Sequence, residues 1–256
     1  MAGIVLLQGL NMPKYFVDLD KFDERPGQVL QLDKRDPVYH HLTQVLRVRV
    51  GDKIIICDGH CIDYHCHVET LTPLVLSIES YRECRTELPF KITLYQAMPK
   101  ADKMEWIVQK AVELGVHAIV PVYTTHCVVR LSKSNGTKTA RYQKIAESAA
   151  GQSMRGIIPV VHEPVGWDNL IKTLPDNQFM ITAYEKADPQ HTLMTAVKSI
   201  KDAQDIGLWI GPEGGFSLKE AEAMEAAEFN LVSLGVRILR TETAAIATLA
   251  QIVVLL

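Results

Sequence analysis

Apolar and polar residues follow two different patterns along this 256-residue chain, and the change falls near residue 88. Before that point, short apolar runs rich in β-branched residues, such as residues 53–57 and 75–78, stand between turn signals such as Val50-Gly51-Asp52. Runs of this kind predict short strands. Helical periodicity in this part is confined to residues 37–48. The pattern therefore predicts a small β-barrel domain over residues 12–87.

After residue 88 the pattern alternates between strands and helices. Residues 92–97 predict a strand, residues 102–114 an amphipathic helix with capping-box spacing at its start and Gly115 at its end, and residues 118–123 a second strand. A strand, a helix and a strand in succession form a right-handed unit with parallel strands. Further strands are predicted at residues 179–184, 208–210 and 231–234. Residues 88–256 thus predict an α/β domain with a mainly parallel sheet.

Two strands of this second domain break into polar loops that lead directly into helices. Gly211-Pro212-Glu213-Gly214-Gly215 follows the strand at residues 208–210, and residues 235–243 follow the strand at residues 231–234. In open α/β sheets, ligands bind in the crevice at the carboxyl ends of the strands. We therefore expect the two loops to lie side by side and to line one pocket.

The first loop has the composition of a rigid backbone cradle. Its glycines permit positive φ angles and a close approach to a ligand, and Pro212 fixes one turn of the path. Ser217 and Glu220 have capping-box spacing, so a helix begins immediately afterwards. The loop is neither a dinucleotide-binding G-x-G-x-x-G nor a P-loop. An ordinary strand-to-helix turn would also use these glycines.

The second loop contains Arg237 and Arg240 beside Glu242, in an otherwise apolar region. Guanidinium groups next to a carboxylate suit phosphate or base recognition better than packing. Thr241 or Thr243 is predicted to cap the last helix. That helix is apolar on most sides, so it needs a cover, either the sheet or a second subunit.

The charge distribution is more informative than the net charge of −3. Residues 130–144 contain five cations and no acidic residue. A basic segment near the presumed crevice could hold phosphates, although an ordinary solvated face explains it equally well. The five cations are Arg130, Lys133, Lys138, Arg141 and Lys144.

The chain lacks the apolar run of roughly 18 residues that a membrane span requires. Residues 4–7 are apolar but have no basic segment before them and no convincing cleavage site, so we expect a cytoplasmic protein. Met12 would make a natural start, which leaves residues 1–11 as a possible upstream extension.

Cysteine and histidine residues gather between residues 57 and 67, which raises the question of a metal site. Their spacing is not the paired C-x-x-C of zinc sites, and alternation along strands directs neighbouring side chains to opposite faces. We expect reduced cysteines and no metal.

The glycine and arginine loops also support a family resemblance. Residues 210–217 and 234–244 resemble the signature pair of the ribosomal RNA small subunit methyltransferase E family, in the SPOUT class of knotted methyltransferases. The resemblance implies transfer of a methyl group from S-adenosylmethionine to N3 of a uridine in 16S rRNA by a homodimer. It also implies a PUA-like N-terminal domain and a deep trefoil knot in the C-terminal domain. The likeness extends to residues 41–52, 103–105, 109–116 and 149–155.

The resemblance implies roles for individual residues. Because the uridine N3 must lose its proton, Glu213 and Glu242 are candidate bases, and Arg237 and Arg240 are candidate stabilisers of the anion. The RNA-binding residues would be Lys14, His41, Arg47, Arg49, Arg130 and Arg155. The cofactor would lie against Ala183, Tyr184, Ile210, Gly211, Pro212, Gly214, Gly215, Leu234, Gly235, Ile238, Leu239 and Thr241.

Two other kinds of protein remain open at this point. The chain could be an RNA-binding protein that keeps the fold without activity, although intact Gly211, Gly214 and Gly215 argue against that. It could instead be a nucleotide-binding enzyme with an ordinary doubly wound sheet, because the glycine loop and the arginines alone would permit it. A comparison of the affinities for S-adenosylmethionine and for ATP distinguishes the methyltransferase from these two alternatives.

Overall fold

The computed structural model describes residues 12, 14–17, 27–129, 135–175, 177–200 and 205–256, and the chain divides into two compact units. The first contains the described residues up to Glu87 together with Gly151–Ile157, and the second contains Leu88–Ala150 and Ile158–Leu256. The sequence pattern does not anticipate that residues 151–157 join the first unit. They do so because Arg155 forms an ion pair with Glu87, and the Gly156 carbonyl accepts a hydrogen bond from the Cys61 amide at 3.1 Å.

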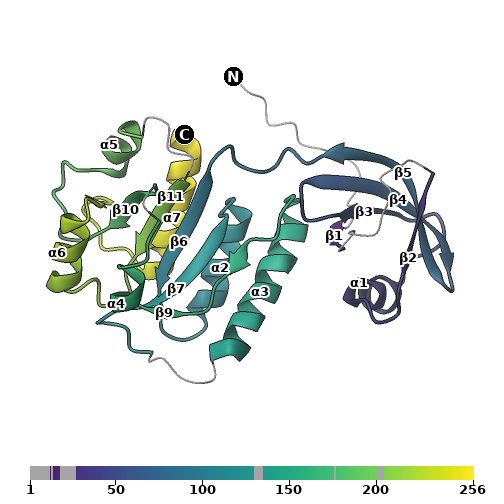
Figure 1. Cartoon of the computed structure of the whole chain (residues 1–256), viewed down its shortest axis with the longest axis horizontal. Coiled ribbons are helices and arrows are strands. Elements are labelled where there is room, and N and C mark those ends of the chain that lie inside the picture. Colours follow the sequence, from purple (N-terminus) through teal and green to yellow (C-terminus); the bar gives the residue numbers. More distant parts are fainter. Residues whose placement is uncertain (1–11, 13, 18–26, 130–134, 176, 201–204) are drawn as a thin grey trace. The chain divides into compact units, whose positions relative to one another are not determined.

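The first unit is built on a five-stranded sheet in the order β1-β3-β4-β5-β2 (Figure 1). β1 and β3 are parallel and the other pairs are antiparallel. β1 and β2 are the two edge strands of this sheet. Among the described strands, no hydrogen-bonded pairing joins β1 to β2 to close the sheet into a barrel. The elements are β1 (Lys14–Phe16), β2 (Val29–Leu32), α1 (Pro37–His40), the π-helical turn η1 (His41–Val45), β3 (Lys53–Cys57), β4 (Ile62–Leu71) and β5 (Leu74–Glu83).

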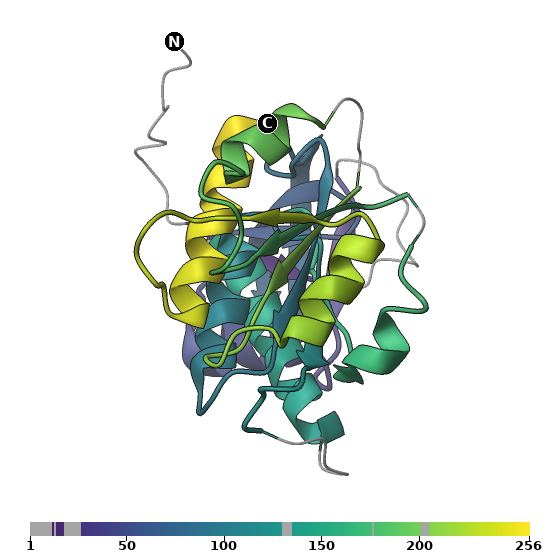
Figure 2. The same cartoon turned by 90° about the vertical axis from the view of Figure 1, so that its left-hand side faces the viewer.

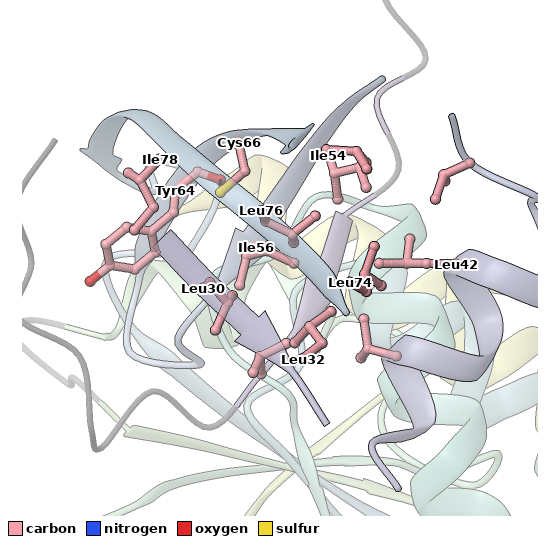
Figure 3. Packing of buried hydrophobic residues seen from close by; sticks show 14 residues of the cluster. Leu30, Leu32, Leu42, Ile54, Ile56, Tyr64, Cys66, Leu74, Leu76 and Ile78 are labelled. Carbon is pink, nitrogen blue, oxygen red and sulfur yellow. Dashed lines mark hydrogen bonds between the residues drawn. The ribbon is translucent and has the colours of Figure 1, made fainter. Parts of the chain in front are cut away.

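Alternate side chains of these strands form the core of the first unit. Ile54 and Ile56 on β3 point into it, as do Leu74 and Leu76 on β5, and Leu42 of η1 closes one end (Figure 3). All five are fully buried. On β5 the buried residues are spaced by two, which is the period of a strand with one buried face. On β3 both faces are covered, because Ile55 and Cys57 are buried as well.

The second unit is built on a parallel sheet in the order β12-β10-β11-β6-β7-β8, with β9 also paired to β7. Every described ladder in this sheet is parallel, which confirms the α/β prediction. The strands are β6 (Lys91–Ala97), β7 (Ala118–Tyr123), β8 (Val160–Val161), β9 (Val165–Gly166), β10 (Phe179–Ala183), β11 (Asp205–Ile210) and β12 (Asn230–Val232).

Helices cover both faces of this sheet, and Figure 2 shows α6 and α7 on opposite sides. Trp209 of β11 packs with Met224 of α6 in one aromatic-rich cluster, while its neighbours Leu208 and Ile210 are buried on the other face. α7 packs against α2, α5 and β11. The helices are α2 (Lys103–Glu113), α3 (Asn135–Gln152), α4 (Trp167–Leu170), α5 (Leu193–Lys198), α6 (Leu218–Ala226) and α7 (Thr241–Leu255).

The structure confirms the helix ends predicted at Gly115 and Ser217 but not the capping box predicted at the start of α2. Ser217 and Glu220 form the expected capping box at α6, and Gly115 ends α2 with a φ of +92°. The capping box predicted for α2 is wrong, because the Asp102 side chain accepts no capping hydrogen bond. The carboxylate expected to complete it, that of Glu105, binds Arg141 at 2.8 Å instead. A long-range ion pair has replaced the local contact.

The threonine cap predicted for α7 is also wrong. Arg240 occupies the cap position, and no side chain caps the helix there. Thr241 lies inside the first turn, and its hydroxyl donates to the Gly211 carbonyl at 2.7 Å. The residue that would have capped the helix therefore joins it to another loop.

The thiols of the first unit are buried to different extents. Burial raises the pKa of the Cys57 thiol and of the Cys66 thiol to about 12, so both stay neutral in ordinary buffers. Among the residues that the structure describes, no group of three or more histidine, cysteine, aspartate or glutamate side chains is arranged to hold a metal. The described helices likewise include none that is both long and apolar enough to cross a membrane.

Candidate functional site

A cavity of about 430 Å³ lies at the carboxyl ends of β10, β11 and β12 in the second unit. Its lining includes every residue that the resemblance assigns to the cofactor, together with Glu213, Arg237 and Arg240. Glu242 is not among the lining residues. Five other lining residues were not predicted from the sequence, and all lie within two positions of a predicted residue: Glu185, Phe216, Ser233, Val236 and Ala244.

Hydrogen bonds hold the two loops of this cavity together. Thr241 donates its hydroxyl proton to the Gly211 carbonyl at 2.7 Å, and the Gln96 side-chain amide donates to the Thr241 oxygen at 2.9 Å. Thr241 and Gln96 are 4% and 0% exposed. The expectation that both loops line one pocket is therefore confirmed, and buried polar contacts fix their separation.

Two glycines of the glycine loop, residues 211–215, lie close to neighbouring side chains. Gly215 has a φ of +68°, and a Cβ there would lie 2.6 Å from Oε1 of Glu185. A Cβ on Gly211 would lie 3.2 Å from the Phe216 ring. The carbonyl oxygens of Gly214 and Gly215 lie 3.0 and 3.2 Å from Nδ1 of His126, the geometry of a ring N–H donor. The loop is thus held from outside the pocket while its backbone stays accessible from within.

Glu220 anchors the far side of the same loop. Its buried carboxylate accepts from the Ser217 amide at 2.8 Å and from the Thr125 amide at 2.8 Å. The capping box of α6 thereby also ties down the segment after β7. A carboxylate that accepts several backbone N–H groups is firmly oriented, so the helix start and the glycine loop before it share one anchor.

The two candidate bases both contact one lysine. Nζ of Lys103 lies 2.9 Å from Oε1 of Glu213 and 3.1 Å from Oε2 of Glu242. Burial alone would raise the pKa of Glu213, but the Lys103 ammonium and the Lys100 backbone amide outweigh it and lower the pKa. A carboxylate whose pKa is lowered is a weaker proton acceptor, which makes Glu213 a poor general base.

The arginines of the second loop lie in a different environment. Arg237 and Arg240 are exposed, on a loop that also projects Val236 and Ile238 with 96% and 90% of their surface accessible. Exposed cations at a pocket rim can meet an incoming anion without first losing buried partners. Apolar side chains this exposed are unusual unless something covers them.

The six residues that the resemblance assigns to RNA binding divide into three groups. His41, Arg47 and Arg49 are exposed around η1 in the first unit. Lys14 and Arg155 are 6% and 3% exposed, and each is paired with a carboxylate, Asp63 and Glu87 respectively. Their burial and their pairing with carboxylates argue against direct contact of these two side chains with a phosphate. Arg130 lies outside the described residues.

Comparison with known families agrees with this architecture. Residues 86–253 match the model of an RNA methyltransferase domain, and residues 35–77 match that of an RNA methyltransferase PUA domain. The first match spans the whole pocket, and the second spans η1 and its exposed cations. The fold and the site therefore define an RNA methyltransferase.

Similar proteins and solved structures identify the family to which the chain belongs. The chain is 33% identical to the ribosomal RNA small subunit methyltransferase E of Bacillus subtilis, over 94% of this chain and 96% of that protein. The Aquifex aeolicus protein of the same name is 31% identical over 88% and 94% of the two chains. The crystal structure of the Neisseria gonorrhoeae protein, bound to S-adenosyl methionine, superposes with a TM-score of 0.81 at 32% identity, over 95% and 98%. The chain belongs to the ribosomal RNA small subunit methyltransferase E family.

Proposed function

We propose that this protein transfers the methyl group of S-adenosylmethionine to N3 of a uridine in 16S rRNA. The observation that supports this most is the single pocket formed by the glycine loop and the arginine loop and locked by Thr241. Its volume of about 430 Å³ lies within the usual range for small-molecule sites. Family membership supplies the reaction and the class of RNA.

The pocket residues fit S-adenosylmethionine on two grounds. Gly215 has a positive φ that favours glycine, and a Cβ on Gly211 would lie 3.2 Å from the Phe216 ring, so glycine at both positions suits a close approach of a ligand to the backbone. Ala183, Leu234 and Leu239 supply an apolar lining suited to an adenine ring. When bound, S-adenosylmethionine supplies a methyl group activated by its positive sulfur.

The chain's own residues would then handle the uridine and its proton. Arg237 and Arg240 are placed to attract the RNA and to stabilise the negative charge that develops on N3. Glu213, with its lowered pKa, contributes little as a base. Glu242 remains the candidate proton acceptor, and full turnover in Glu242→Gln would remove it from that role.

Exposed cations of the first unit would bind the RNA backbone. Replacing Arg47 or Arg49 by alanine is expected to weaken RNA affinity for every sequence tested and to lower the slope of log K against log salt by about 1 per residue. Filter binding at several salt concentrations measures both quantities. Lys198→Ala, an exposed change on α5, is the matched control; an equal change in its slope would contradict a specific role for the arginines.

We also propose that the protein is a cytoplasmic homodimer with a trefoil knot. Support for a dimer comes from Val236, Ile238 and Val254, which are 96%, 90% and 83% exposed on the arginine loop and on α7. Three apolar side chains with this much exposed surface are better explained if a second copy of the chain covers them than if they face water. Light scattering should give twice the chain mass at micromolar concentration, and a monomer would contradict the proposal.

One experiment tests the reaction itself. Mass mapping of 16S rRNA from a strain lacking this gene should reveal one uridine without its base methyl group, and purified protein with S-adenosylmethionine should restore it. RNA that is fully methylated without the gene would refute the assignment. Binding of RNA without transfer would favour a noncatalytic protein, and calorimetric binding of ATP in place of S-adenosylmethionine would favour an ordinary nucleotide-binding enzyme.

A further inference from the structure

Lys103 occupies a position that helix electrostatics does not favour. It is the first residue of α2, where the positive end of the helix dipole repels a cation. Its partners compensate for this, because Nζ lies 2.9 Å from Glu213 and 3.1 Å from Glu242. Glu242 in turn lies in the first turn of α7, where a negative charge is favoured. The ammonium therefore joins three segments.

Two of those segments, the glycine loop and the start of α7, contribute residues to the lining of the pocket. Glu213 lies in the middle of the glycine loop, and Glu242 follows the arginine loop directly. Oε1 of Glu213 also accepts a hydrogen bond from the Lys100 backbone amide at 3.2 Å, so the loop after β6 contributes a second donor. These contacts lie at the outer edge of the site, whereas the bond from Thr241 to Gly211 lies in its interior.

We propose that Lys103 is a positioning residue that clamps the glycine loop to the start of α7 and so sets the affinity for S-adenosylmethionine. This inference rests on the proposed methyl transfer. Lys103 is not among the residues that line the cavity. It acts through the two carboxylates, which without it would be neighbouring like charges and would push the loops apart.

The electrostatics of the three groups agree with a clamp. The pKa of Lys103 is raised, chiefly by its hydrogen bond to Glu213, and the pKa of Glu213 is lowered. Both shifts favour the charged forms of Lys103 and Glu213 at neutral pH. With side chains 18–27% exposed, the three groups are shielded enough for the pairing to be stronger than that of a fully solvated pair.

The test compares four variants in steady-state methylation. Lys103→Met is expected to raise the KM for S-adenosylmethionine about tenfold and to change kcat by a smaller factor, because the main loss falls on cofactor binding. Lys103→Arg keeps the charge and should restore the KM to within about threefold of the original value. Adding Glu213→Gln to Lys103→Met should recover part of the lost affinity, since it removes one of the two like charges that Lys103 no longer separates. Lys110→Met, which removes an ion pair to Glu113 on the same helix, is the matched control and should leave the KM unchanged.

Three results would overturn the clamp: an unchanged KM in Lys103→Met, a fall in kcat alone, or equal losses in Lys103→Met and Lys103→Arg. Tryptophan fluorescence of each variant checks folding. If Lys103→Met does not fold, the KM of Lys103→Arg still tests the clamp, because the clamp predicts a value within about threefold of the original. An original protein that transfers no methyl group would refute the proposed function. An active original protein with an unaffected Lys103→Met would refute only the role of Lys103.

Discussion

Replacing Gly215 by valine is expected to weaken S-adenosylmethionine binding by about a hundredfold or more. Gly215 has a φ of +68°, a region that costs a residue with a Cβ about 1–2 kcal/mol and a β-branched residue more. The new Cβ would also start 2.6 Å from Oε1 of Glu185, so that side chain must move. The loop would relax to another path in the free protein, and binding would have to reverse that change. Isothermal titration calorimetry measures the loss.

The control for this change is Gly166→Ala in the same unit. Gly166 has a φ of −77°, and a Cβ there would meet no atom within 4 Å. Its affinity should equal that of the original protein. If Gly215→Val bound S-adenosylmethionine as tightly as Gly166→Ala, the glycine loop would not be the cofactor site.

Replacing Thr241 by valine is expected to destabilise the second unit by about 2–4 kcal/mol, because it breaks two buried hydrogen bonds. The Gly211 carbonyl loses its donor at 2.7 Å, and the Gln96 amide loses one of its two acceptors, at 2.9 Å, while it keeps the Ala97 carbonyl. Valine has nearly the same shape as threonine, so the loss would come from hydrogen bonding and not from packing. Affinity for S-adenosylmethionine should fall as well, because the same bonds hold the two loops together.

Urea denaturation followed by tryptophan fluorescence isolates this effect. All three tryptophans, Trp106, Trp167 and Trp209, lie in the second unit, so the signal reports on that unit alone. Thr173→Val removes an exposed hydroxyl that donates within one turn, and should change stability by less than about 0.5 kcal/mol. Equal stability of Thr241→Val and Thr173→Val would mean that the interloop bond contributes nothing.

Local pattern was sufficient to predict most of the parallel sheet and the pocket. The residues of β6, β7 and β11 form apolar runs bounded by turn signals, and glycines and arginines follow the strands at the edge where ligands bind. The capping box at Ser217 was predictable for the same reason, since both partners lie within one turn. These features depend on residues that are close in the sequence.

Long-range contacts account for what the sequence did not predict. The Thr241 hydroxyl binds a carbonyl 30 positions away in place of capping its own helix. Arg155 is buried against Glu87, 68 positions away. Lys103 meets two carboxylates that are 110 and more positions distant. Spacing along the chain contains no signal for such pairs, because only the fold brings them together.

Hydrogen exchange with and without S-adenosylmethionine tests the central claim most directly. If the glycine loop and the arginine loop form one cofactor pocket, amides of residues 211–216 and 234–241 should gain protection together at the same ligand concentration. The sheet strands farther from the cavity should change little. Protection of only one loop, or of neither, would contradict the account.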